Sequence, residues 1–582
     1  MNRMKVGVAI PVLLIGLLSA AVVQAQVTKK QLDAVRANFK APQDFYHKLS
    51  DEQRKMLSGG ALNFFHAIQH WSESEKVALA RKNAPRSKLN GGLTSMPLLV
   101  PNVEPSFGPV QVSNPATDFD FGPSSGFTQS ETSTAWCGHN VVVAYNDSGS
   151  YWQSGFATNF QNLSFNGFST SDDQGEEYVD RGFLSSATAN PQNFVEGDPV
   201  VACTSASTFY YSSLFFTVAS FSPYTPLTAI SVSKSTNGGA SFGAPVSAAT
   251  KDAFTHFLDK DWMAVNPSNP NQIAVTYTDF DFSFTVCPTS PRTAIELVGS
   301  SDGGNTWGAP QVIFEACNAP PDFPSVQGSQ VAFSPLGAVN VAYELSSSGV
   351  PTGRQIEFAQ APSLGAAFGA IMPVADVIGV GDGSAVQGGI RAFLDIQGMA
   401  VDRSGLSTDG NIYIVFHDST NFRKGFDGVP YGYSDAMIVK SSNNGVTWGA
   451  PVQVNTNPEP LENGLGTDAY MPGVAVDNST GEVGVCWYDR RNDRLNFLVD
   501  RFCGHSTDAG ATFTNVRVTR QNFPPIHGTD DLVNPSYFGD YDTVASDALK
   551  MTRGFIGAFQ VVKGEGPHTP VPHPDVKANN FN

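Results

Sequence analysis

Residues 300–307 read SSDGGNTW and are followed by Gly308, Ala309 and Pro310. The underlying pattern is Ser, any residue, Asp or Asn, any residue, Gly, any residue, Ser or Thr, and an aromatic residue. It recurs in full or in part at 171–178, 235–242, 361–368, 441–448 and 506–513, the first and third of these being the weaker copies. Successive copies begin 61 to 80 residues apart. Such a period is the signature of a repeat architecture.

The spacing within each copy predicts a tight turn between two strands. A short acceptor side chain such as Asp302 can bond the backbone N–H groups that follow it, and Gly304 can adopt a positive φ. The aromatic residue at the end, such as Trp307, is large enough to pack under the turn and fix it to the next sheet. We therefore expect the copies to be structural and not catalytic.

The six segments resemble the Asp-boxes, or BNR repeats, of the sialidase-like β-propellers, over roughly residues 130–520. The resemblance implies an all-β propeller of four-stranded antiparallel blades. Pairs of first and second strands are expected near 132–145, 199–217, 261–277, 325–343, 396–416, 470–488 and 536–559. Seven pairs predict seven blades, and the alternative is six, the number in true sialidases.

Six boxes serve seven strand pairs, so the last blade lacks its outer strands. Residues 106–113 (SFGPVQVS) resemble the segments that follow the boxes at 441–448 and 235–242. We expect these N-terminal strands to pair with the C-terminal pair and close the ring, which removes exposed sheet edges.

Three regions follow from composition along the chain. Residues 1–25 carry Arg3 and Lys5, an apolar run and a Val-Gln-Ala ending, as in a signal peptide. Residues 26–92 show charge, helical periodicity and capping boxes, which predict a helical N-terminal segment. Residues 93–582 form the propeller. The expected location is secreted or periplasmic.

The composition of the chain limits the classes of partner that it can bind. Of 582 residues only 15% are charged and the net charge is −18, which argues against a nucleic-acid partner because phosphate binding needs clustered Lys and Arg. No segment after the signal peptide reaches 18 apolar residues, so no membrane span is expected. The even number of cysteines predicts disulfides in an oxidising compartment. Sequential pairing gives Cys137–Cys203, Cys287–Cys317 and Cys486–Cys503.

An acidic residue stands just before each expected first strand. These are Glu131, Asp198, Asp261, Asp322, Asp395, Asp468 and Asp540, called here the first-strand acids. The loops that lead into first strands converge near the axis, on the face opposite the boxes. Repulsion between carboxylates there would raise one pKa enough for general-acid catalysis beside an ionised partner, as glycoside hydrolysis requires. The candidate catalytic residues are Asp261, Asp468, Asp489, Asp540 and Tyr541. The alternative is that each carboxylate caps a turn.

Residues 487–494 (WYDRRNDR) and 534–542 (NPSYFGDYD) are the densest polar loops. Guanidinium groups bind carboxylates or sulfates bidentately, as an acidic sugar would need. The candidate substrate-binding residues are Arg391, Arg490, Arg491 and Tyr537. The equal alternative for the first loop is a salt-bridged hairpin, with Asp489, Asp493 and Asp500 as local partners.

The resemblance to sialidases implies three arginines on the substrate carboxylate, a Tyr–Glu nucleophile pair and an Asp acid/base. The chain departs from that pattern, because it has no Arg-Ile-Pro motif before the first blade and no arginine between Arg86 and Arg181. No cofactor is expected. Binding of Ca²⁺ is an alternative role for the acidic residues, although neither EF-hand spacing nor an H-E-x-x-H motif occurs in the sequence.

The functional hypothesis is a propeller that binds or cleaves glycans, or binds a glycoprotein, at its central face, with glycoside hydrolysis as the reaction if it is an enzyme. The alternative is a non-catalytic scaffold, with residues 26–92 docking it to a partner.

Overall fold

The computed structural model describes residues 40–49, the single positions 54, 57, 61 and 65, and residues 109–582 with gaps. The gaps are 116–117, 122–123, 157–160, 381–385, 387–389, 391, 393, 425–429, 458–465, 526–529, 531–532, 534–537 and 564–572. The signal peptide and most of the helical segment lie outside the described residues.

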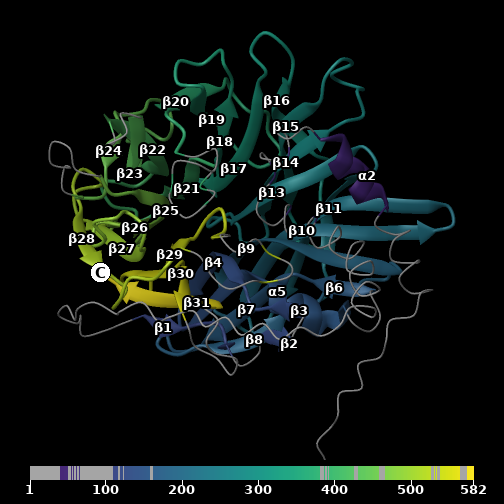
Figure 1. The fold of residues 1–582 in the computed structure, drawn as a ribbon, viewed down its shortest axis with the longest axis horizontal. Coiled ribbons are helices and arrows are strands. Elements are labelled where there is room, and N and C mark those ends of the chain that lie inside the picture. Colours follow the sequence, from purple (N-terminus) through teal and green to yellow (C-terminus); the bar gives the residue numbers. More distant parts are fainter. Residues whose placement is uncertain are drawn as a thin grey trace, which may run out of the picture.

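Seven sheets stand around a common axis, so the chain is a seven-bladed propeller, as predicted (Figure 1). Six blades run in chain order from the inner to the outer strand, and every neighbouring pair within their four main strands is antiparallel. In blade 2 a fifth strand, β6 (Asn162–Ser164), adds parallel to the inner strand. A small hairpin, β2 (Phe119–Phe121) with β3 (Ser124–Gly126), and the short helix α5 (Ser148–Tyr151) lie beside blade 1.

The four main strands of each blade have the following bounds. Blade 1 is β4 (Gln129–Cys137), β5 (Asn140–Asp147), β7 (Asn166–Ser171), β8 (Val179–Phe183), and blade 2 is β9 (Gln192–Ser205), β10 (Thr208–Phe221), β11 (Tyr224–Ser235), β12 (Val246–Asp252). Blade 3 is β13 (His256–Val265), β14 (Ile273–Asp281), β15 (Arg292–Ser300), β16 (Gln311–Cys317), and blade 4 is β17 (Ser325–Phe333), β18 (Val339–Ser346), β19 (Arg354–Ala361), β20 (Met372–Val377). Blade 5 is β21 (Ile396–Val401), β22 (Ile412–Lys424), β23 (Pro430–Ser441), β24 (Val452–Gln453), and blade 6 is β25 (Ala469–Val476), β26 (Val483–Asp489), β27 (Asp500–Ser506), β28 (Thr514–Arg517). Blade 7 is β29 (Val544–Ser546), β30 (Phe555–Lys563), β31 (His573–Phe581) and β1 (Val110–Gln111).

Each box is the turn between the third and fourth strands of a blade. In the copy at 300–307, Asp302 accepts hydrogen bonds from the backbone N–H groups of Asn305 and Thr306, and Gly304 donates to Ser300 Oγ. The aromatic residue packs against the preceding blade, not the following one: the Trp448 ring meets Phe358 of blade 4 with centroids 5.1 Å apart. The boxes therefore join consecutive blades.

Blade 7 closes the ring by combining three C-terminal strands with one strand that precedes blade 1. Its outer strand is β1, which pairs with β31 through Val110 opposite Ala578 and Gln111 opposite Lys577. The expected segment 106–113 thus pairs with a third C-terminal strand, which was not anticipated, and not directly with β29 and β30. This blade has no box between its third and fourth strands, because the fourth strand comes from the other end of the propeller.

A register shift interrupts the inner strand of six blades near the face opposite the boxes, called here the loop face. At four of these shifts a residue other than glycine has a positive φ: Glu131 and Asp198 at 53°, Lys260 at 50° and Met471 at 52°. Such a conformation costs about 1–2 kcal/mol for each residue. Local strain of this kind collects where a structure holds a specific side-chain arrangement.

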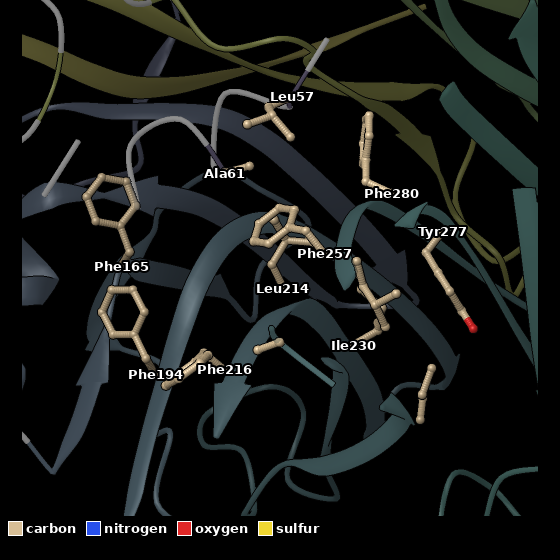
Figure 2. Close-up of a cluster of buried hydrophobic side chains, with 14 of the residues drawn as sticks. Leu57, Ala61, Phe165, Phe194, Leu214, Phe216, Ile230, Phe257, Tyr277 and Phe280 are labelled. Carbon is tan, nitrogen blue, oxygen red and sulfur yellow. The ribbon is translucent and has the colours of Figure 1, made fainter. Parts of the chain in front are cut away.

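Helix α2 (Lys40–Lys48) packs against blades 2 and 3, beside β11 and β13 in Figure 1. Phe45 is 1% exposed and meets Phe282 edge-on, with ring centroids 5.0 Å apart, and Phe257 at 5.8 Å. Figure 2 shows Leu57 and Ala61 on one side of the same cluster and Phe194 and Phe216 on the other. The apolar side chains described in this segment therefore pack on the propeller itself.

Three disulfides are present, with the pairing expected from the sequence. Cys137–Cys203 joins the inner strands of blades 1 and 2, Cys287–Cys317 ties a loop of blade 3 to its outer strand, and Cys486–Cys503 links directly opposite residues of β26 and β27.

Candidate functional site

Six of the seven first-strand acids are closed off from solvent, and three of them, Glu131, Asp198 and Asp261, act together on the buried Tyr541. Glu131, Asp198, Asp261, Asp395, Asp468 and Asp540 are 0–2% exposed. Five of them lie at or near a register shift of an inner strand, and Asp540 precedes the inner strand of blade 7, which has no such shift. Asp322 is the exception and is exposed.

Glu131 and Asp540 illustrate how tightly this layer is built. Glu131 accepts hydrogen bonds from the Asn146 side chain at 2.8 Å and from the backbone N–H of Asp540 at 3.1 Å. Gly539, at φ 74°, lies so close that an added Cβ would come within 2.7 Å of the Glu131 side chain. Only glycine fits there, because both the backbone angle and the space exclude a side chain.

Three side chains from two blades close the axis beside these acids. Lys260 Nζ lies 3.3 Å from the centroid of the Tyr541 ring, and Tyr541 donates a hydrogen bond to the Pro199 carbonyl oxygen at 2.9 Å. The Trp262 and Tyr541 rings meet edge-on at 5.5 Å. Burial raises the pKa of Asp261 well above its usual value. Two of the sequence candidates, Asp261 and Tyr541, are therefore brought together, but in a closed layer and not in an open cleft.

Two further first-strand acids have strong local partners. Asp468 accepts hydrogen bonds from the Ser434 backbone N–H at 3.1 Å and from Asn496 Nδ2 at 2.7 Å. Asp395 pairs with Arg354 at 2.8 Å. Burial alone would raise the pKa of Asp395. The hydrogen bond from His417 and the positive charge of Arg354 outweigh burial and lower this pKa. These contacts match the alternative in which the acids organise loops.

The arginine-rich loop of blade 6 is held by local contacts. Asp489 pairs with Arg491 at 2.7 Å and accepts from the Trp487 indole N–H at 2.8 Å. Arg490 is 0% exposed, donates to the Asn496 carbonyl oxygen at 2.9 Å and lies 3.7 Å from Asp468. Both guanidinium groups are thus engaged within the loop, as in the salt-bridged alternative. Arg391 and Tyr537 lie outside the described residues.

A partly open charged cluster lies at the loop-face end of blade 3, called here the blade-3 cluster. Its members are Lys251, His256, Asp279, Asp281, Arg292, Glu296 and Glu315. Asp279 lies at its centre. The carboxylate oxygens of Asp279 are 2.6 Å from Lys251 Nζ, 2.9 Å from His256 Nδ1 and 3.1 Å from an Arg292 guanidinium nitrogen. Glu315 is 45% exposed at its side chain and pairs with Arg292 at 2.8 Å.

The protonation of the cluster follows from these pairs. Burial alone would lower the pKa of His256 and raise the pKa of Asp279. The hydrogen bond between the two residues outweighs burial, so the pKa of His256 is raised and that of Asp279 is lowered. The positive charge of Lys251 lowers the pKa of Asp279 further. Asp279 is therefore ionised at neutral pH and is not a reservoir for a catalytic proton.

Metal binding by this cluster is a separate question. One ligand atom each of His256, Asp279 and Asp281 lies within 4.8 Å of the others. The group fits a cation poorly, because Lys251 and Arg292 already place positive charge on Asp279.

Exposed aromatic side chains flank the blade-3 cluster. Phe284 follows Asp281 closely and is 49% exposed, and Phe323 precedes β17 and is 54% exposed. Both have a positive φ, 57° and 45°, which is rare for a bulky residue. The Cys287–Cys317 disulfide ties their loops together, and Asn318 donates to the Phe323 carbonyl oxygen at 3.1 Å. The two rings are thus presented on constrained backbone.

Asp279, its partners and the two phenylalanines were not predicted from the sequence. A signal was present for Arg292, which lies opposite Asp281 across the hairpin of β14 and β15. Nothing in the local sequence marks Phe284 or Phe323, because their exposure depends on packing between blades.

No protein-family model matches the chain, and no curated protein does. Solved structures similar to it include the Hadza microbial sialidase Hz136, at 12% identity over 71% of this chain and 73% of that one, with a TM-score of 0.40. A polysaccharide lyase of family PL25, an ulvan lyase, matches at 11% identity over 80% and 96%, with a TM-score of 0.42. The α-L-arabinofuranosidase Arb93A of Fusarium graminearum matches at 10% identity over 81% and 98%, with a TM-score of 0.38. At these levels the chemistry of this chain must be argued from its own residues.

In the part of the chain that the structure describes, no helix has the length and apolar character to cross a membrane.

Proposed function

We propose that the chain is an extracellular glycan-binding propeller that holds its ligand on the loop face of blades 3 and 4. The observation that carries this is the pair Phe284 and Phe323, two exposed rings on disulfide-linked loops beside the blade-3 cluster. Exposed aromatic side chains on restrained loops mark binding sites, since burying them on a ligand costs little additional order. The neighbouring charges supply hydrogen bonds to hydroxyl or acidic groups.

Binding is favoured over cleavage by the state of the carboxylates. A hydrolase needs two carboxyl groups about 5–9.5 Å apart that flank an accessible bond, one of them protonated. Six first-strand acids are buried, and Asp279 has a lowered pKa and three cationic partners. Catalytic roles for Asp261, Asp468, Asp489, Asp540 and Tyr541 remain a hypothesis that requires the closed layer to open.

The test is a glycan panel screened with the full protein and with the double variant Phe284→Ala/Phe323→Ala. We expect the wild type to retain a subset of glycans and the double variant to lose them, with an unchanged thermal midpoint because both rings are exposed. Leu336→Ala is the matched control, since Leu336 is 96% exposed in a turn on the box face.

Two results would count against the proposal. If the double variant retained the same glycans as the wild type, the loop face of blades 3 and 4 would not be the binding site. Release of sugar from a retained glycan, abolished by Asp261→Asn but not by the double variant, would establish hydrolysis at the closed layer instead.

A further inference from the structure

A cavity of about 540 Å³ runs along the axis from the box face, on the side of the ring away from the proposed glycan site. Residues of all seven inner strands line it, and it opens between turns that include Pro267, Pro335, Arg403 and Lys550. On β13 the lining starts at Trp262, whose ring contacts the buried Tyr541. The cavity therefore has its mouth on the box face, and its size is in the range of small-molecule sites.

The charge of the lining contrasts with that of the chain. The protein carries a net charge of −18, yet none of the described residues that line the cavity is acidic. The lining includes two cations, Arg403 from the β21–β22 turn and Lys550 from the β29–β30 turn. A pocket lined by one sign of charge concentrates ligands of the opposite sign.

Arg403 has a charge that the described part of the chain leaves without an ion pair. Its backbone N–H donates to Asn478 Oδ1 at 3.1 Å, which fixes the turn, but its guanidinium has no hydrogen bond or ion-pair partner among the described residues. Burial lowers the pKa of Arg403, while the adjacent Asp402 acts in the opposite direction. Because Arg403 is half-buried and lines the cavity, its guanidinium is available to an anionic group of a ligand.

Lys550 is placed at the mouth by a constrained turn. It has a φ of 59°, and Asp547 holds the turn by accepting from the backbone N–H groups of Leu549, Met551 and Thr552 at 2.9, 2.7 and 2.9 Å. Its Nζ donates to the carbonyl oxygen of Arg403, which brings the turns of blades 7 and 5 together. The ammonium group retains further donors for a ligand.

The wall of the cavity below these two cations carries no charge among the described residues. Trp262 and Met399 supply apolar surface. A ligand that fits would present an anionic group to Arg403 and Lys550 and a small, partly apolar body to the wall.

We propose that the box-face end of the central channel is a binding site for a small molecule bearing an oxyanion group, a carboxylate, sulfate or phosphate. The site goes beyond the proposed glycan binding and lies on the opposite face, so the two are tested separately.

The experiment is titration calorimetry of the full protein at constant ionic strength with sodium sulfate, sodium phosphate and sodium D-glucuronate, and with D-glucose as the uncharged control. We expect at least one anion to bind and glucose not to bind. Tight binding of glucuronate alone would identify an organic acid as the ligand, whereas equal binding of sulfate or phosphate would identify the free inorganic anion.

Arg403→Gln should weaken that binding about tenfold or more, as expected for the loss of hydrogen bonds to a charged group. Lys550→Asn, which tolerates a positive φ, provides a second variant if Arg403→Gln lowers the thermal midpoint. Arg520→Gln, exposed and outside the lining, should have no effect. Absence of binding by all three anions, or equal affinity in wild type, Arg403→Gln and Lys550→Asn, would overturn the proposal, whatever the glycan panel shows.

Discussion

Lys260 and Tyr541 meet at the axis of the ring, with the lysine Nζ 3.3 Å from the centroid of the aromatic ring. One residue comes from the inner strand of blade 3 and the other from the loop that leads into blade 7, and together with Trp262 they separate the loop face from the channel. A buried ammonium over an aromatic face is stabilised by the ring quadrupole. Burial and the charges of Glu131, Asp198 and Asp261 raise the pKa of Tyr541 well above its usual value.

Substitutions at Tyr541 should distinguish its ring from its hydroxyl. Tyr541→Phe keeps the ring over Lys260 and loses only the hydrogen bond to Pro199, so we expect a loss of about 1 kcal/mol in unfolding free energy. Tyr541→Ala leaves a cavity and an unpaired buried ammonium, and should cost about 3–5 kcal/mol. Urea unfolding followed by tryptophan fluorescence measures both. Equal losses in the two variants would show that the ring does not close the axis.

The boxes should make the fold sensitive to acid. The hydrogen bonds from Thr306 lower the pKa of Asp302 from 3.8 to about 2, and those from Thr512 do the same for Asp508. Because folding depresses these pKa values, the stabilisation is complete above pH 3.8 and is lost as the pH falls through about 2. Asp302→Asn and Asp508→Asn should flatten the fall in thermal midpoint between pH 4 and pH 2.

Asp172→Asn is the matched control for the acid series. Asp172 is an exposed carboxylate at the second position of the weak box of blade 1, and no hydrogen bond of its side chain appears in the described part of the chain. An acid profile flattened equally by this substitution would mean that net charge, and not the box hydrogen bonds, sets the response.

The blade-3 cluster should titrate as a coupled pair. The pKa of His256 is raised by Asp279, so the pair stabilises the fold fully below the ordinary histidine pKa of about 6.5, and the contribution fades as the pH rises through the folded value. Nuclear magnetic resonance of the His256 ring should give a pKa above the ordinary histidine value of about 6.5. Asp279→Asn should lower the His256 value. An unchanged His256 titration in that variant would separate the two groups.

Helix α2 should come away from the propeller when its main anchor is removed. Phe45→Ala deletes a ring buried against Phe257 and Phe282, with an expected cost of about 3–5 kcal/mol to docking. Hydrogen exchange of residues 40–49 should accelerate while the inner strands stay protected. His47→Ala, on the exposed side of the same helix, is the control. Continued protection of 40–49 in Phe45→Ala would show that other contacts hold the helix.

Most of the fold could be predicted from the repeat, because each box is a local structure that a few neighbouring residues specify. Ser300, Asp302 and Gly304 are joined by hydrogen bonds within the turn, so the spacing of the boxes predicted the blade period. The number of blades was predicted from the seven expected strand pairs. The third strand of blade 7, β31, was not predicted, since nothing local marks a strand whose partners lie at both ends of the propeller.

The candidate site was less accessible to such reasoning. The positions of Asp261 and Asp540 near the axis followed from blade topology. Their burial did not, because it depends on Lys260 adopting a positive φ and on Tyr541 reaching across the axis. The exposure of Phe323 and the unpaired guanidinium of Arg403 likewise arise from contacts between blades that no single segment encodes.

The pairing of β1 with β31 sets an order of events in the life of the chain. Gln111 donates a hydrogen bond to the Val576 carbonyl oxygen, 465 positions further along. Strand β1 is therefore synthesised long before its partner β31, and contacts of such long range form slowly. Until β31 has been synthesised, blade 7 keeps open edges that invite pairing with other chains. Closure of the ring therefore requires the nine residues of β31, and a chain that ends before them lacks the strand that joins β30 to β1.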